Sequence, residues 1–317
     1  VEPRSHPGFL RGPRWRWWKP IAALLATVFL AIFVSGIPAL AGLLMDGVDL
    51  TRLDPQALTL GPYAFLGNNV GLALLIPLAM LMQWLFFGVR PRWLSSVQGG
   101  FRWGWFLRCV ALVLPIWLVL LGVELAIGGL PEGIGPRPYT LLLTVGILLT
   151  TPFQAAGEEY LMRGLEQRLV ASYVRSDALG WMLATAVSSV SFMALHGAGD
   201  PWLNVFYLSF GVAAAWVTWR TGGLEASIAI HVVNNLLSEA FLPVTDISGL
   251  FDRSAGAGDP SVLFHAAVLA GASALIAYVD GEAAGWVKVS PRPDQPRLAR
   301  TRAFQESPEP FEDGSVW

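Results

Sequence analysis

The chain has 317 residues, of which 54% are hydrophobic and only 14% are charged. A soluble domain of average composition carries about 25% charged residues, so this composition predicts a protein that crosses the membrane several times. The net charge of −2 excludes the basic footprint of a nucleic-acid-binding protein. The single cysteine, Cys109, excludes a disulfide framework and a thiolate metal site, and its apolar surroundings predict a packed thiol.

Apolar runs of membrane-spanning length recur along the whole chain. They lie at about 21–45, 63–87, 104–127, from Tyr139 onward, 178–197, 202–219, 224–242 and 261–279. A helix needs about 20 apolar residues to cross the hydrocarbon core of a bilayer. We therefore predict an all-α fold, a polytopic membrane helix bundle of about eight transmembrane helices.

The basic residues predict how this bundle is oriented. With the amino terminus inside, the outer segments hold only Arg52, Arg137 and Arg253 of the 21 lysines and arginines, and the other 18 (21 − 3) lie in inner segments or helices. Cytoplasmic loops carry an excess of basic residues. The pattern therefore predicts a multi-pass protein of the cell membrane with both termini in the cytoplasm.

Two adjacent carboxylates and an arginine lie within the fourth predicted span. Charge at that depth costs about 3 kcal/mol per residue or more, which indicates that these groups are used. On a helix, Glu159 and Arg163 are i,i+4 neighbours that can pair. Glu158 lies about 100° further round the helix and lacks that partner. The spacing predicts one structural carboxylate, Glu159, and one working carboxylate, Glu158.

This helix is expected to continue beyond the two carboxylates as an amphipathic segment that is not immersed in lipid. Its apolar stripe consists of Leu161, Leu165, Leu169 and Val170, and its polar face holds Arg163, Glu166, Gln167, Arg168 and Arg175.

Two further motifs place a histidine on a helix in the second half of the chain. Phe192-x-x-x-His196 closes the fifth span, and His231-x-x-x-Asn235 lies in the seventh. Each i,i+4 pair shares one helix face. A turn near residues 176 and 177 makes the fourth and fifth helices antiparallel, with Glu158 and His196 each 18 to 20 residues from it. The two side chains are therefore expected at similar depth, where they can meet.

The three motifs, in this order, resemble the pattern of the CPBP family of intramembrane proteases. The family is named for CAAX prenyl proteases and bacteriocin-processing enzymes, and it is also called the Abi family. Its pattern is Glu-Glu-x-x-x-Arg, Phe-x-x-x-His and His-x-x-x-Asn/Asp. The Thr-Gly-Gly-Leu turn at 221–224 is similar to the Thr-Gly-Ser-Leu turn of that family. The resemblance covers about residues 139–242.

The resemblance implies an intramembrane endopeptidase and a role for each motif residue. Glu158 is implied as the general base, His196 as a group that positions or activates water, and His231 with Asn235 as the donors that stabilise the oxyanion. Glu159 and Arg163 are implied as a supporting pair, with Phe192 packing beside His196. Amide hydrolysis independently needs a base for water and donors for the developing negative charge. The partner is then a membrane-anchored or transmembrane protein or peptide, with no nucleic acid involved.

Two alternatives stay open at this point. Glu158, His196 and His231 would also make a His2Glu zinc set with an open fourth position, although a mechanism with no metal or other cofactor is favoured. The second alternative is a non-enzymatic membrane protein, a transporter or a scaffold, that uses the same cluster for proton relay or helix locking. Glu124 and Glu239 lie near helix ends, where they are expected to be interfacial, although Glu239 is also i,i+4 from Asn235 and could extend its face. His6 and His265 receive no role.

These observations divide the chain into five parts. The parts are a cytoplasmic basic segment at 1–20, three accessory transmembrane helices at 21–138, the catalytic core at 139–242, an outer loop and last transmembrane helix at 243–279, and a disordered cytoplasmic tail at 280–317.

Overall fold

The computed structural model describes residues 5–49, 51, 61–247 and 253–280. Eight of the helices in these ranges are long and apolar enough to cross a membrane. The described residues contain no strand, only an isolated bridge between Ser96 and Gly223. The predicted all-α, eight-span bundle is confirmed, and the protein is a multi-pass membrane protein. Of the predicted tail at 280–317, residue 280 is described, and residues 281–317 lie outside the described ranges.

The helices follow the predicted spans closely. The first half contains α1 (Trp18–Met45), α2 (Pro62–Ala73), α3 (Leu75–Phe87) and α4 (Trp103–Gly128). The fourth span is continuous through α5 (Thr140–Glu159), the π-helical segment η4 (Tyr160–Glu166) and α6 (Gln167–Ala171). The remaining spans are α7 (Asp177–Leu195), α8 (Pro201–Thr221), α9 (Glu225–Ser238) and α10 (Val262–Val279). Three short helical turns are η1 (Pro7–Leu10), η3 (Pro91–Leu94) and η5 (Leu242–Val244).

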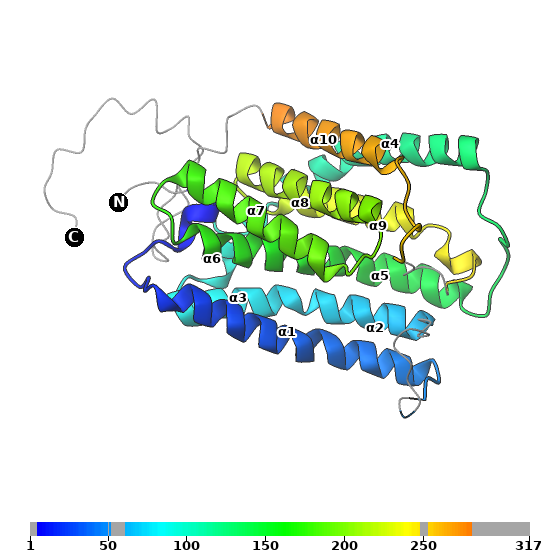
Figure 1. The fold of residues 1–317 in the computed structure, drawn as a ribbon, viewed down its shortest axis with the longest axis horizontal. Helices are drawn as coiled ribbons and strands as arrows, with labels where there is room; N and C mark the ends of the chain where they lie inside the picture. Colours follow the sequence, from blue (N-terminus) through cyan, green and yellow to red (C-terminus); the bar gives the residue numbers. More distant parts are fainter. Residues whose placement is uncertain (1–4, 50, 52–60, 248–252, 281–317) are drawn as a thin grey trace, which may run out of the picture.

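The central helices α5 to α9 lie between two outer groups of helices. Figure 1 shows α1 with α2 and α3 along one edge of the bundle, and α4 with α10 along the opposite edge. Helix α9 packs against both α4 and α5, and α8 packs against both α7 and α10. The three sequence motifs therefore lie on helices of this central group.

Glycines permit the closest helix crossings. A Cβ atom at Gly67 or Gly71 of α2 would overlap backbone oxygens of α1, and one at Gly157 of α5 would overlap the carbonyl oxygen of Leu72. Small residues let membrane helices approach backbone to backbone. Gly157 directly precedes Glu158, so this crossing fixes the height and rotation of the working carboxylate.

The polar face of η4 and α6 is turned into the protein. Glu166 accepts a hydrogen bond from Ser191 (2.7 Å), Gln167 donates to Ser188 (3.1 Å), and Arg168 donates to Gln83 (2.8 Å). The residues that share this burial, each at most 8% exposed, are Arg163, Glu166, Gln167 and Arg168. Within a membrane, polar groups must be satisfied by neighbouring protein. The amphipathic pattern therefore marks an internal polar layer.

Part of the amino-terminal segment belongs to this layer as well. The sequence indicates only a basic flank, but Phe9 and Leu10 of η1 are buried. The guanidinium of Arg168 lies 4.6 Å from the centre of the Phe9 ring, and Nε2 of His6 lies 3.3 Å from the Leu94 carbonyl oxygen. Burial lowers the pKa of the His6 imidazole well below its usual value, and the charge of Arg168 adds to this effect. The segment thus closes one end of the helix bundle.

Candidate active site

Glu159 is the buried centre of the site. Its Oε1 atom accepts a hydrogen bond from Nη1 of Arg163 at 2.9 Å, and both side chains are fully buried. The predicted ion pair is therefore present. The same oxygen lies 2.9 Å from Nδ1 of His231 on α9, so this carboxylate also connects the first motif to the third.

The Glu159 contact fixes how His231 is presented. An ionised carboxylate only accepts hydrogen bonds, so Nδ1 of His231 carries the hydrogen. The other ring nitrogen, Nε2, then faces Glu158, whose Oε2 atom lies 3.7 Å away. This separation is too long for a direct hydrogen bond. His231 and Glu158 therefore face one another across a gap without being locked together.

Glu158 is held by a residue that the sequence did not single out. Nε2 of Gln154, one helical turn earlier on α5, donates to Oε1 of Glu158 at 2.6 Å. The side chain of Glu158 is 16% exposed, whereas that of Glu159 is fully buried. The two neighbouring carboxylates thus have different surroundings, as the helix geometry predicted.

His196 follows the last residue of α7 and is anchored by a backbone contact and a ring contact. Its Nδ1 atom lies 2.7 Å from the carbonyl oxygen of Phe192, which accepts a hydrogen from it. The ring stacks on that of Tyr207 with 3.9 Å between centroids. Burial lowers the pKa of His196, although an electrostatic interaction with Glu158 opposes this shift. In the neutral form, Nε2 is an acceptor.

Phe192 packs against side chains of both the first and the second motif. Its ring centre lies 4.5 Å from that of His196, as expected, and 4.4 Å from the guanidinium carbon of Arg163. A cation over an aromatic face is stabilised by the ring quadrupole. This one side chain therefore joins the first two motifs.

Asn235 lies opposite the same glutamine that holds Glu158. Its Nδ2 atom donates to Oε1 of Gln154 at 3.0 Å. An amide nitrogen carries two hydrogens, so a second N–H of Asn235 remains for a further acceptor. Gln154 thus connects two predicted site residues on different helices, and its i,i+4 spacing from Glu158 is the signal that could have identified it.

A third carboxylate approaches the site from the end of α9. Glu239 accepts a hydrogen bond from the Thr151 hydroxyl at 2.6 Å, and Thr151 accepts one from Asn69 at 3.1 Å. Glu239 also interacts electrostatically with Glu158 and His231. The sequence predicted an interfacial side chain, but the i,i+4 spacing from Asn235 places Glu239 on the face that carries the site.

The alternative zinc set does not form a ligand group in this arrangement. Across residues 5–49, 51, 61–247 and 253–280, no three side chains of His, Cys, Asp or Glu are grouped so that they could hold a metal ion. Nδ1 of His231 is hydrogen-bonded to Glu159 and Nδ1 of His196 to the Phe192 carbonyl, so Nε2 is the ring nitrogen that each histidine has left for a ligand.

The comparisons with known proteins agree with the motifs. Residues 140–237 match the family model described as type II CAAX prenyl endopeptidase Rce1-like. The chain is also similar to the uncharacterized protein YyaK of Bacillus subtilis (strain 168), with 29% identity over 106 residues, which are 32% of this chain. The match spans only 34% of the length of YyaK. No solved structure matches the chain.

The fold and the site define a polytopic membrane protein with a cluster of carboxylates and histidines inside its helix bundle. Over residues 140–237 the chain is similar to the Rce1-like family, a family of CAAX-type intramembrane proteases. The resemblance drawn from the three motifs is confirmed over these residues. The division of the chain into five parts and the roles of single residues stay predictions.

Proposed function

We propose that the protein is an intramembrane endopeptidase in which Glu158 activates water to hydrolyse a peptide bond of a membrane-associated substrate. One observation carries the proposal: Gln154 holds one oxygen of Glu158, while the other oxygen faces Nε2 of His231 at 3.7 Å. A carboxylate presented in this way across a gap has the geometry of a general base.

In the proposed reaction, Oε2 of Glu158 takes a proton from water as the water oxygen bonds to the carbonyl carbon of the substrate. The carbonyl oxygen becomes an oxyanion. When the intermediate collapses, the C–N bond breaks and Glu158 returns the proton to the leaving amine. Neutral His196, whose Nε2 is an acceptor, holds the second hydrogen of the attacking water.

Asn235 and His231 are proposed to stabilise the oxyanion. Asn235 offers the N–H that Gln154 does not use. Nε2 of His231 donates a hydrogen only when the ring is an imidazolium, because Nδ1 already carries the hydrogen shared with Glu159. The Glu159 carboxylate stabilises that cation, and Arg163 balances the buried charge. The supporting pair is therefore part of the electrostatics of the site.

The proposed substrate is a membrane-anchored or transmembrane protein or peptide whose scissile bond lies at the depth of Glu158. The proposed location is the cell membrane with both termini in the cytoplasm, as the distribution of basic residues favours. The alternative of a transporter or scaffold is not adopted, because the domain that carries the cluster matches a protease family.

The test is a search for new peptide termini. The full-length protein and its Glu158→Ala variant are each purified, reconstituted in vesicles and incubated with a membrane proteome. The wild type should generate new termini near membrane segments, and the variant should generate none, although it elutes as the same folded species. Equal sets of termini from both proteins would refute the role of Glu158.

A further inference from the structure

A directed chain of four hydrogen bonds runs from Trp117 on α4 to the working carboxylate on α5. Its links are Trp117 Nε1 to Asn234 Oδ1 (3.2 Å), Asn234 Nδ2 to Asn235 Oδ1 (3.1 Å), Asn235 Nδ2 to Gln154 Oε1 (3.0 Å), and Gln154 Nε2 to Glu158 Oε1 (2.6 Å). Every amide in the chain accepts through its oxygen and donates through its nitrogen. The chain therefore has a single polarity.

The two ends of the chain enforce that polarity. An indole nitrogen only donates, and an ionised carboxylate only accepts. Trp117 therefore turns the oxygen of Asn234 toward α4, which leaves the nitrogen of Asn234 to donate to Asn235. The nitrogen of Asn235 must then point toward Gln154 and the site. If the amide of Asn235 were reversed, its nitrogen would face the nitrogen of Asn234 and its oxygen would face the oxygen of Gln154, and neither hydrogen bond could form.

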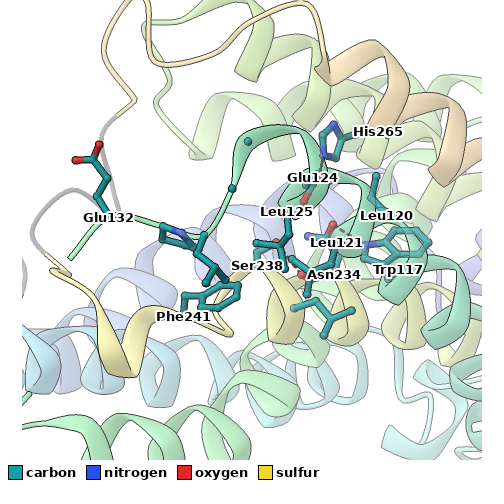
Figure 2. Close-up of a pocket in the computed structure, with 15 residues that line it drawn as sticks. Trp117, Leu120, Leu121, Glu124, Leu125, Glu132, Asn234, Ser238, Phe241 and His265 are labelled. Carbon is teal, nitrogen blue, oxygen red and sulfur yellow. Dashed lines mark hydrogen bonds and ion pairs between the residues drawn. The ribbon is translucent and has the colours of Figure 1, made fainter. Parts of the chain in front are cut away.

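The outer end of this chain forms part of the wall of a pocket. The pocket has a volume of about 460 Å³ and lies between α4, α9, α10 and the segment after α4. Figure 2 shows Trp117 and Asn234 side by side on its wall, with Ser238 one helical turn beyond Asn234. Trp117 is only 6% exposed, so its N–H has little competition from solvent. The indole N–H is therefore available to donate to Asn234 at the start of the hydrogen-bond chain.

We propose that Trp117 and Asn234 are positioning residues that set the donor polarity of Asn235, while Gln154 fixes the orientation of Glu158. This inference rests on the proposed function. If Asn235 stabilises an oxyanion, its nitrogen must face the site, because a reversed amide would present an oxygen to negative charge. A tryptophan outside all three motifs thereby determines whether a motif asparagine is a donor or an acceptor.

The chain can be tested without any proteolysis. Protein labelled with ¹⁵N-tryptophan in detergent micelles should give an indole N–H resonance that disappears in Trp117→Phe, which assigns it. This resonance should shift in Asn235→Asp, two links away, and in Glu158→Gln at the far end, because the polarised chain transmits the change of acceptor. Ser238→Ala is the control. Ser238 lines the same pocket and donates to the backbone of Asn234 (2.8 Å), but it lies outside the chain and should leave the resonance unchanged.

The kinetic test uses a peptide that spans a cleavage site found in the terminus search. Trp117→Phe should lower kcat about 10-fold with little change in KM, which is less than the ~10²–10³ for complete loss of an oxyanion donor, because the Asn235 amide is still present. Trp105→Phe is the matched control, because Trp105 is a buried tryptophan of the same helix and no described residue accepts a hydrogen bond from its indole N–H. It should keep the wild-type kcat.

Two results would overturn the inference. One is an indole resonance of Trp117 that is identical in the wild type, Asn235→Asp and Glu158→Gln. The other is a Trp117→Phe variant with the kcat of Trp105→Phe. If the terminus search finds no proteolysis but the resonance shifts as expected, the proposed function fails while the hydrogen-bond chain stands.

Discussion

The Oε1 atom of Glu159 receives two donors at once, Nη1 of Arg163 and Nδ1 of His231, each at 2.9 Å. The first donor lies one helical turn away and the second 72 residues away. One buried oxygen therefore joins a local ion pair to the orientation of a distant ring. This relationship leads to different expectations for variants at Glu158, Glu159 and Arg163.

Arg163→Ala should destabilise the protein, whereas Glu158→Gln should leave it folded. Removal of Arg163 leaves the charge of Glu159 buried without its arginine partner, and breaking a buried pair in this way typically costs about 3–5 kcal/mol. Glu158→Gln keeps the shape of a side chain that already lies partly exposed. Thermal unfolding in detergent measures both. Similar unfolding curves for the two variants would show that the carboxylates do not have separate roles.

Glu159→Gln should reduce activity even where the variant is folded. The amide keeps the volume of the carboxylate but removes the charge that stabilises an imidazolium at His231. We expect kcat to fall by about 10²-fold, close to the loss of one oxyanion donor, with a smaller effect on KM. Steady-state kinetics on the cleaved peptide provides the measurement. A Glu159→Gln variant with wild-type kcat would show that His231 does not act as a cation.

The metal-free mechanism predicts that chelation is harmless. Protein purified in a chelator should contain much less than one zinc per chain and keep its activity, and Asn235→Ala should lose activity as an oxyanion donor is removed. Elemental analysis in parallel with the peptide assay tests this. If zinc and activity were lost together and restored together, the zinc alternative would be supported. A fully active Asn235→Ala variant would contradict the role of α9.

Gly157→Ala should disturb the crossing that places Glu158. The added Cβ would overlap the carbonyl oxygen of Leu72, and such overpacking typically costs about 1–3 kcal/mol. Gly122→Ala is the control, because no atom of the described residues outside its own stretch of helix lies within 4 Å of its added Cβ. That variant should be neutral or more stable by up to ~1 kcal/mol, since alanine is the better helix former. The unfolding temperatures of the two variants give the comparison, and equal values would show that the crossing tolerates a methyl group.

Acid should destabilise the protein through His6. Its folded-state pKa lies well below the ordinary value of 6.5, because the ring is buried beside Arg168. The unfolded chain therefore binds the proton first, and stability should fall as the pH drops below about 6.5 toward the folded pKa. A variant without this group, His6→Gln, should have a flatter dependence of unfolding temperature on pH between 7 and 5. Parallel curves for the two proteins would refute this origin of the acid sensitivity.

The sequence alone determined the features that depend on local spacing. Runs of about 20 apolar residues predicted the eight spans, because bilayer thickness sets the helix length. The Glu159–Arg163 pair and the packing of Phe192 against His196 also followed from the sequence. Both are i,i+4 relationships, and helix geometry fixes them before any tertiary contact forms.

Only the tertiary structure decided which helix faces meet. The crossing of Gly157 over Leu72 sets the rotation of α5, and that rotation brings Glu159 to His231 and Gln154 to Asn235. Nothing in the local sequence around Trp117 indicates that its N–H orients an amide on α9. Polar side chains buried in a membrane must find partners on neighbouring helices. The choice among those partners depends on how the whole bundle packs, which the spacing within one helix does not specify.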